Sequence, residues 1–499
     1  MKFEDVLRQV GDEGRFQTLI IILLLLPTSF LNAFYDSIIQ MATPDHWCRI
    51  PHLGHLSNEI QHQMIRPINN DTKQSSTCHR FDLNYESIKT IDDFHQLTQN
   101  YSSLNDIPIV KCTDGYQYDQ SLYRETAVTW FDFVCDRDFY TNNIISLSLI
   151  GLAILTPIIS NLSDRIGRRK TLMIIFLMAA LATANPLLTK TLPTFLIARF
   201  ISGGVLNVFY QIPFVMTQEV VSQKYRTRSS CLSAIFYSLG SCFVPIVAKF
   251  TGHWVLFNLF QFLSIVPFIL CYSLFPESPF WLISAKRYGE AYKELERIGR
   301  VNRKQIPSTL MRDIQSIDAE IDATKVDDTK DKFSDLFLMP GLRMKTFTLA
   351  LTFIACLIGY GGIAYNTINL EAKNQLYNFF LLSMVDIPAL LLFWYLVNTR
   401  FGRRWSNVLG LMICGVSLII PTFTPVKYSI MVNLICTIFG KFGIAGVYMV
   451  IYQHASELFP TTLRNQGMGV CATISSLVGI ALPQLIYMVI PTINIILFV

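Results

Sequence analysis

The chain has 499 residues, of which 51% are hydrophobic and only 15% charged, and its formal net charge is +5. A composition this apolar excludes a disordered chain and argues against a soluble enzyme. The basic residues stand in short segments between apolar blocks rather than in one patch, so nucleic-acid binding is not expected.

The apolar residues gather in blocks of about 20, each long enough to cross a ~30 Å hydrocarbon core as a helix. Backbone groups in lipid must pair within their own segment, so each block is predicted to be helical. In chain order the blocks are 16–40, 142–160, 171–189, 193–216, 230–249, 253–275, 347–366, 375–397, 405–421, 428–452 and 466–490. A twelfth block is expected to start near Pro491 and to be incomplete at Val499. The first block lacks a small-residue cleavage site, so we interpret it as a span rather than a signal peptide.

The basic residues at the ends of the blocks predict an orientation. Segments 1–15, 161–170 and 398–404 hold three or four Lys or Arg each, and 276–346 holds thirteen. The short loops on the opposite side hold one each, namely Lys190, Lys249, Lys373 and Lys427. The positive-inside rule therefore places the N-terminus in the cytoplasm of a multi-pass protein, which we expect in the plasma membrane.

The polar segment 41–141 is expected outside the cell. It contains four cysteines, Cys48, Cys78, Cys112 and Cys135, which predict two disulfides with three possible pairings. Sequons at Asn70 and Asn100 predict glycans in the same segment.

A second polar segment, 276–346, separates the blocks into two groups. Its amphipathic stretches 284–300 and 308–323 predict short helices on the cytoplasmic face, with a disordered linker as the alternative. The predicted parts are a first bundle (1–275, including the external loop), a linker (276–346) and a second bundle (347–499).

A basic motif occurs once in each group of blocks. Residues Asp164 to Lys170 follow the second block and Arg400 to Arg404 follow the eighth; both contain Arg-x-Gly-Arg-Arg. This duplication predicts two parallel repeats related by an axis along the membrane normal. The repeated positions, which we interpret as a latch between the halves with simple anchoring as the alternative, are Asp164, Arg165, Gly167, Arg168, Arg169, Arg400, Gly402 and Arg403.

Acid–base pairs recur at the same predicted side. Glu219 precedes Arg226 by seven residues and Glu457 precedes Arg464 by seven, and Glu277 lies just after the sixth block. Seven residues make two helical turns, so each pair could share one face and contribute to a cytoplasmic gate. The alternative is a set of surface pairs of little energetic weight.

Four charged residues fall inside predicted spans: Asp36, Arg199, Asp386 and Lys441. A charge in the bilayer core costs at least ~2.5 kcal/mol, so such residues usually face a wet cavity or a partner. Asp386 precedes Pro388, which frees backbone groups and suits a cavity wall. We expect Asp386 to face the substrate path; a buried pair with Lys441 is the alternative.

These features resemble the major facilitator superfamily, and within it the organic cation/anion transporter family (solute carrier family 22-like). The resemblance rests on Thr43-Pro-Asp-His46, Phe131-Asp-Phe-Val-Cys-Asp136, Asp164-Arg-Ile-Gly-Arg-Arg169, Pro276-Glu-Ser-Pro-Phe-Trp-Leu282 and Ala455-Ser-Glu-Leu-Phe-Pro460. It implies an all-α membrane protein with two six-helix bundles that rock about a central site for organic ions. Cation recognition uses aromatic faces as well as an acid. The mid-span aromatics Tyr210, Phe353 and Tyr360 resemble that family's cavity wall, and Tyr365 and Tyr448 are further candidates.

Three positions depart from the family pattern. Ser476 stands where a charged residue often sorts cations from anions, Leu390 replaces a lysine of anion carriers, and Thr399 replaces the acid of the second basic motif. We therefore expect polyspecific transport of small organic cations or zwitterions by alternating access, carried out by a monomer in the bilayer. The alternatives are an anion carrier of the same family and a truncated, non-transporting membrane protein. Nucleotide-binding and zinc motifs do not occur in the sequence, so no cofactor, metal or enzymatic activity is expected.

Overall fold

The computed structural model is helical over most of the part that it describes, and the chain divides into two compact units. Unit 1 comprises Met1–Ser37, Asn143–Val247 and Asn258–Val499, and unit 2 comprises Ile38–Asn142 with Ala248–Phe257. The described residues are 3–35, 39–54, 56–67, 76–85, 88, 90–98, 107–188, 191–305, 307, 309–316, 335–369, 375–423, 429–459 and 464–498.

All eleven predicted blocks are helical in the structure. The first consists of α2 (Arg15–Ile20), a π-helical turn (Ile21–Leu25) and α3 (Leu26–Tyr35). The others are α7 (Phe139–Ile166), α8 (Arg168–Leu188), α9 (Leu192–Val220), α10 (Gln223–Thr251), α11 (Trp254–Leu270), α16 (Pro340–Asn369), α17 (Gln375–Val397), α18 (Gly402–Ile419), α19 (Ser429–Leu458) and α20 (Arg464–Phe498). Within the described residues, nine of these helices are long and apolar enough to span a membrane by length and composition alone.

The expected start of a twelfth block near Pro491 is wrong. The structure continues α20 from Arg464 through Pro491 to Phe498 as one helix. Prolines also stand inside six other helices, for example Pro157 in α7 and Pro388 in α17. Proline is tolerated in membrane helices because neighbouring groups can satisfy the freed carbonyl, so it did not mark a boundary here.

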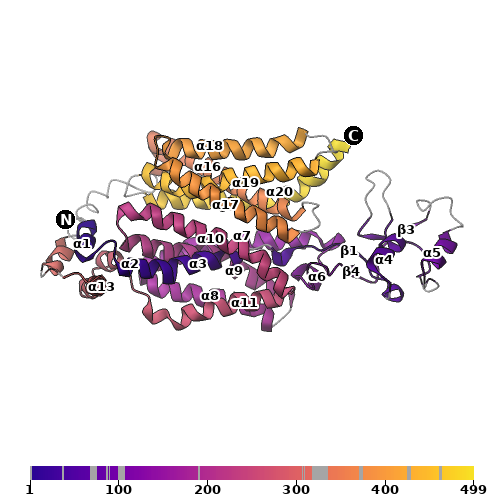
Figure 1. Cartoon of the computed structure of the whole chain (residues 1–499), viewed down its shortest axis with the longest axis horizontal. Helices are drawn as coiled ribbons and strands as arrows, with labels where there is room; N and C mark the ends of the chain where they lie inside the picture. The colour runs from indigo at the N-terminus through magenta and orange to yellow at the C-terminus, as the bar shows by residue number, and fades with distance from the viewer. Residues whose placement is uncertain are drawn as a thin grey trace. The chain divides into compact units, whose positions relative to one another are not determined.

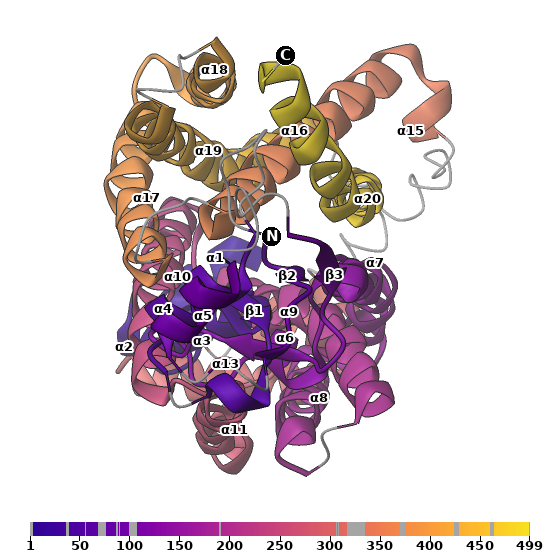
Figure 2. The ribbon, with the colours of Figure 1, turned by 90° about the vertical axis from the view of Figure 1, so that its right-hand side faces the viewer.

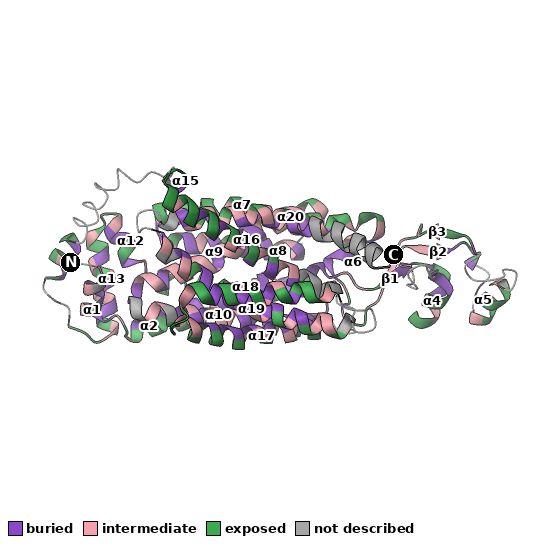
Figure 3. Cartoon of the chain, turned by 90° about the horizontal axis from the view of Figure 1, so that it is seen from above, coloured by how far each residue is buried: buried purple, intermediate pink, exposed green. Residues whose placement is uncertain are grey.

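The long helices of unit 1 form two layers. Figures 1 and 2 agree that α16 to α20 lie together on one side and that α3 and α7 to α11 lie on the other. Close approach between α18 and α19 uses small residues: a Cβ on Gly410 of α18 would lie 2.7 Å from the Gly443 carbonyl of α19. Trp405 and Met412 of α18 have exposed apolar side chains, and Figure 3 colours parts of α18 as exposed.

One end of unit 1 carries a small helical cluster. It contains α1 (Phe3–Val10), α12 (Pro279–Ser284) and α13 (Tyr288–Val301), which share an apolar core with Ile20 and Trp281. Asn302 joins this cluster to the N-terminal segment, because its side chain donates to the Gly11 carbonyl (2.9 Å) and accepts from the Phe16 amide (2.9 Å). The first predicted linker helix is thus confirmed as α13. Of the second predicted helix, residues 310–316 are helical, and residues 317–323 lie outside the described part of the chain.

Unit 2 holds most of the large polar segment and contains two small antiparallel sheets. Strand β1 (His46–Cys48) pairs with β4 (Tyr116–Tyr118), and β2 (His79–Phe81) pairs with β3 (Ile109–Lys111). The short helices are α4 (Asn58–Ile65), α5 (Ile91–Thr98) and α6 (Ala127–Phe131). The core of unit 2 is an apolar cluster around Trp47, Leu53, Met64 and Ile65.

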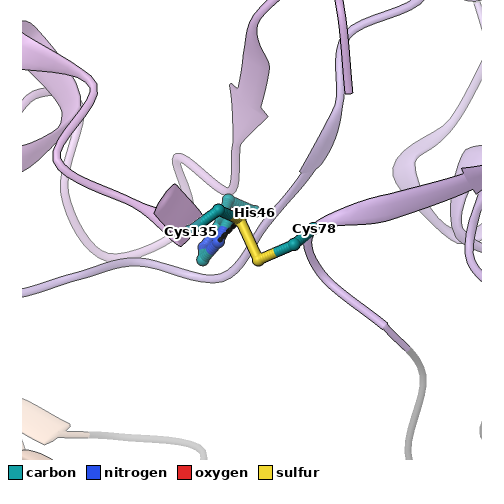
Figure 4. Close-up of side chains that lie close together, drawn as sticks. All are labelled: His46, Cys78 and Cys135. Atoms are coloured by element: carbon teal, nitrogen blue, oxygen red, sulfur yellow. Dashed lines mark hydrogen bonds between the residues drawn. A yellow bond between two sulfur atoms is a disulfide. The ribbon is translucent and has the colours of Figure 1, made fainter. Parts of the chain in front are cut away.

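The four cysteines of unit 2 are all paired. Disulfides join Cys48 to Cys112 and Cys78 to Cys135, which is one of the three pairings that the sequence left open. His46 lies beside the second disulfide, with Nε2 3.7 Å from Cys135 Sγ (Figure 4). These three residues have the donors of a metal site, but the disulfide uses both thiolates, and the thiolate is the metal-binding form. The sequons at Asn70 and Asn100 lie outside the described residues.

Candidate functional site

The intramembrane acid Asp386 is paired inside unit 1. It lies on α17 and is 3% exposed, and its Oδ2 is 3.6 Å from Nζ of Lys441 on α19, which is 7% exposed. The other carboxylate oxygen, Oδ1, is buried and has no hydrogen-bond partner within the described part of the chain. The structure therefore contains the buried Asp–Lys pair, and one acceptor of that pair remains open.

Aromatic rings surround the lysine of this pair. Lys441 Nζ is 3.4 Å from the ring centroid of Tyr360 on α16, which favours a cation–π interaction. The rings of Tyr360 and Tyr448 lie 5.7 Å apart, and those of Tyr448 and Tyr452 lie 5.9 Å apart. Phe353 contacts Tyr452 edge-on at 5.2 Å. An acid, a lysine and a row of aromatics thus come together from α16, α17 and α19.

Tyr452 was missed by the sequence analysis. It lies one helical turn after Tyr448 on α19 and is 42% exposed, against 47% for Tyr448. The spacing of four residues, which puts two tyrosines on one helix face, was the signal that could have identified it.

The pair lies near the first group of helices. Asp386 lies within electrostatic range of Cys242 of α10, and Tyr210 of α9 lies within that range of Tyr452 of α19. The hydroxyl of Tyr210 hydrogen-bonds Ser233, whose Oγ is 2.8 Å from Ser29 Oγ. Residues of α9 and α10 therefore lie near Tyr452 and Asp386.

Ser476 and Arg199 make contacts within their own helices. Ser476 Oγ donates to the Ala472 carbonyl of its own helix at 2.9 Å. Arg199 lies over the Phe195 ring at 5.3 Å. Asp36 and the side chain of Tyr365 lie outside what the structure describes.

The first basic motif is held by three acids, of which Asp164 pairs with an arginine of the motif. Arg168 Nη2 is 3.0 Å from Asp164 Oδ1 and 3.3 Å from Glu219 Oε1. The helix cap comes from Glu277 rather than Asp164: Glu277 Oε1 accepts from the backbone N–H groups of Arg168 (2.9 Å) and Arg169 (3.1 Å). A carboxylate at these amides satisfies two donors that the start of α8 leaves open.

Aromatic rings complete this motif. The indole Nε1–H of Trp281 donates to the Asp164 carbonyl at 2.7 Å. The Arg169 guanidinium lies over the Tyr272 ring at 4.8 Å. All these contacts join α7, α8, α9 and the segment after α11, so they lie within the first half of the chain. Arg165 is exposed.

The predicted two-turn pairs are wrong in their local structure. Helix α9 ends at Val220, so Glu219 and Arg226 lie on different helices and share no helix face. Glu457 and Arg464 are likewise separated by the end of α19, and their side chains lie outside the described part. For the first pair, the error came from extending one helix across a turn that carries no glycine or proline.

The second basic motif lacks the acid at its first position, and the structure shows what replaces it. Thr399 Oγ1 donates to the Leu396 carbonyl at 2.7 Å and accepts from the Phe401 amide at 3.3 Å. The threonine thus closes a local turn. Arg400 is exposed, whereas Arg403 and Gly402 are half-buried.

Comparisons with known proteins agree with this architecture. The profile of the Major Facilitator Superfamily matches residues 132–483. The proton:xylose symporter XylE, at 17% identity, aligns over 71% of this chain and 80% of its own with a TM-score of 0.57. A partially occluded inward-open form of XylE from E. coli gives a TM-score of 0.53 over 69% of this chain and 81% of its own, at 16% identity. At these identities the solved structures show the fold alone.

Several proteins of known function have higher sequence identity to this chain than the solved structures do, and their alignments cover nearly the whole chain. The carcinine transporter of Drosophila melanogaster is 29% identical over 97% of this chain and 72% of its own length. Organic cation/carnitine transporter 2 of Mus musculus is 30% identical over 97% of this chain and 86% of its own. The β-alanine transporter of Drosophila melanogaster is 28% identical over 98% and 82%. The chain therefore belongs to the major facilitator superfamily and, within it, to the solute carrier family 22-like group, as a multi-pass membrane protein that transports small organic solutes.

Proposed function

We propose that this protein carries small organic cations or zwitterions by alternating access, with Asp386 as the group that receives the substrate's ammonium. The observation that carries the proposal is the open, buried Oδ1 of Asp386 beside the Lys441–Tyr360 contact. A buried carboxylate oxygen without a donor is costly, so an incoming ammonium gains a charge-assisted bond there.

The lysine restricts what can bind. Leaving Lys441 unpaired in a buried site would cost several kcal/mol, so a bare cation at Asp386 competes with the existing ion pair. A zwitterion brings its own carboxylate for Lys441, which keeps both charges compensated. The names of the carnitine and β-alanine transporters among the relatives support this preference for substrates that carry both charges.

The exposed tyrosines supply the remaining recognition. Tyr448 and Tyr452 offer ring faces that attract an alkylammonium group by about 0.5–2 kcal/mol each. Ser476 on α20 stands where related carriers often have a charged residue, so this chain has no charge at that position.

A charge test on purified protein checks the proposal. The full chain would be placed in proteoliposomes, and uptake of β-alanine, its methyl ester and tetraethylammonium would be compared. Asp386→Asn should lower uptake of β-alanine and of its methyl ester by about 10- to 100-fold, since a hydrogen bond to a charged group is worth about 1.5–3 kcal/mol. Uptake of tetraethylammonium, which has no N–H and is attracted to the carboxylate by charge alone, should also fall. Ser383→Ala is the matched control, because Ser383 lies one turn away on α17, is equally buried and bonds only to the Phe379 carbonyl of its own helix.

The same experiment separates the alternatives. Equal uptake by the wild type and Asp386→Asn would remove the carboxylate from the mechanism. Uptake of a dicarboxylate but of no ammonium compound would favour an anion carrier in which Lys441 binds substrate. Folded wild-type protein without flux for cations, zwitterions or anions would favour a non-transporting membrane protein.

The wider arrangement is part of the proposal. Residues 1–275 and 347–499 would be the two bundles that rock, with 276–346 as their cytoplasmic connection and the N-terminus in the cytoplasm. The basic motifs and Glu219, Glu277 and Glu457 would form the inner gate of a monomer in the plasma membrane. The charge distribution of the loops supports this orientation.

A further inference from the structure

A polar pair joins α18 and α19 at the end where α18 begins. The side-chain amide nitrogen of Asn407 is 3.0 Å from Nδ1 of His454. Asn407 is 5% exposed and His454 is half-buried. Neither residue belongs to the basic motifs or to the candidate substrate site.

The internal repeat shows that this pair is specific to the second half. The basic motifs align Arg168 with Arg403, and the same offset aligns Leu172 with Asn407. The acids Glu219 and Glu457 define the offset for the later helices, which aligns Met216 with His454. Leu172 and Met216 are 0% and 2% exposed and lie in one apolar cluster. The second half therefore has a hydrogen-bonded, titratable pair where the first half has ordinary apolar packing.

The orientation of the amide matches one protonation state of the ring. With the amide nitrogen of Asn407 toward the ring, as in this structure, the amide donates and Nδ1 of His454 accepts, which is the arrangement of a neutral ring with its proton on Nε2. The amide oxygen of Asn407 is buried and has no hydrogen-bond partner among the residues that the structure describes. If His454 gained a proton on Nδ1, a turn of the amide would bring this oxygen to the new donor. The pair can thus hold either state of the ring with a hydrogen bond.

The surroundings of the pair are basic. Arg403 lies one turn before Asn407 on α18, and both Arg403 and Arg404 act electrostatically on His454. On α19 the next acid is Glu457, whose side chain is outside the described part of the chain. Protonation of His454 would add a positive charge beside Arg403 and Arg404.

We propose that His454 and Asn407 form a proton-binding site. Through this site, the pH on the side of the membrane where the basic motifs lie controls the passage of cationic substrates. A local positive charge lowers the concentration of cations at the mouth of a path. A lower pH on the side of the basic motifs therefore slows the entry of cations from that same side. This inference rests on the proposed cation or zwitterion transport.

The first test does not depend on transport. Nitrogen NMR of histidine-labelled full-length protein in nanodiscs distinguishes a ring that accepts at Nδ1 from one that donates there. One of the eight histidine signals should show the Nε2–H tautomer near neutral pH, disappear in His454→Gln, and lose its tautomer preference in Asn407→Leu. A His454 ring protonated at Nδ1 near neutral pH, or one that does not change its charge above pH 5, would overturn the proposal.

The second test measures the consequence. Tetraethylammonium is supplied on the side of the membrane where the basic motifs lie. Its entry should fall about threefold when the pH on that side is lowered from 7.5 to 5.5, the range in which imidazole changes its charge. The double variant Asn407→Leu/His454→Met restores the apolar pair of the first half and should keep its flux while losing this pH dependence. An unchanged pH dependence in that variant contradicts the inference and leaves the proposed transport function standing.

Discussion

Gly167 and its counterpart Gly402 in the second motif both have a positive φ, but only Gly167 has close neighbours. Its φ is +104°, and a Cβ there would lie 2.5 Å from Glu277 Oε2 and 3.0 Å from the Trp281 ring. Gly402 has φ +65°, and a Cβ there would meet no atom within 4 Å, so an alanine suffers only the ordinary left-handed strain. Replacing each glycine by alanine therefore separates the cost of backbone strain, present at both positions, from the cost of the clash, present only at Gly167.

We predict that Gly167→Ala lowers the stability of the purified protein by about 2–4 kcal/mol and that Gly402→Ala lowers it by about 1–2 kcal/mol, from backbone strain of this size with an added clash in the first case. Thermal unfolding in detergent and uptake in proteoliposomes measure the difference. Equal losses for both variants would mean that the Glu277 contact adds nothing.

The sequence identified which residues carry unusual charges better than it identified the residues that they contact. It singled out Asp386 and Lys441 from the cost of burying charge, and the structure pairs them. It did not identify the carboxylate that caps α8, which is Glu277, 109 residues from Arg168 in the chain. Spacing cannot reveal such a contact because it depends on how the segment after α11 folds back onto α8.

The start of α8 depends on the Glu277 carboxylate. Its Oε1 accepts from two backbone amides of α8, and carboxylates at helix starts are favoured by the helix dipole. We predict that Glu277→Ala destabilises the protein by about 1–2 kcal/mol and that Glu277→Gln costs less, because an amide oxygen still accepts. Asp164→Asn is the control, since the Asp164 side chain is 70% exposed and its pair with Arg168 should add little. A larger loss for Asp164→Asn than for Glu277→Ala would disprove this ranking.

In unit 2, the contact of Arg66 with β1 links the sheet to α4. Arg66 is buried and donates to both carboxylate oxygens of Asp45, at 2.5 and 3.1 Å, and to the His46 carbonyl. Burial raises the pKa of Asp45, but the hydrogen bond and charge of Arg66 outweigh it and leave that pKa below its ordinary value. Burial also lowers the pKa of His46. Both groups bind protons more readily when unfolded, so the stability that they contribute is lost as the pH falls.

We predict that hydrogen-exchange protection of residues 46–66 in the full chain falls as the pH is lowered from 7 to 4, after correction for intrinsic exchange rates. Arg66→Met should reduce protection at pH 7 by about 1 kcal/mol, a value discounted because the Asp45 side chain is 49% exposed. Arg80→Met is the control, because Arg80 reaches Asp114 only at 4.0 Å. The prediction fails if the two variants lose the same protection.

For the whole molecule, hydrophobic block length located every long helix, because a ~30 Å core demands about 20 apolar residues whatever their tertiary contacts. The same argument failed at Pro491, where one helix continues beyond the length of a span. It also could not show how the halves meet, since that depends on single polar side chains inside apolar helices.

One such contact joins the halves where α7 begins. Gln484 of α20 donates to Ser146 Oγ at 2.7 Å, and Ser146 Oγ donates to the Ile480 carbonyl at 2.9 Å. Ser146 is 5% exposed, so this chain of bonds is shielded from water. Under the proposed orientation it closes the outer side, and alternating access requires that it break in each cycle.

We therefore predict that Ser146→Cys/Gln484→Cys, joined by a short thiol cross-linker, stops transport, and that cleaving the linker restores it. The single variants Ser146→Cys and Gln484→Cys, given the same reagent, should keep their flux and so exclude modification of native cysteines as the cause. A cross-linked protein that transports as fast as the cleaved one would mean that α7 and α20 stay together throughout the cycle. The motion would then have to occur between other helices, and the two layers could not rock as whole bundles.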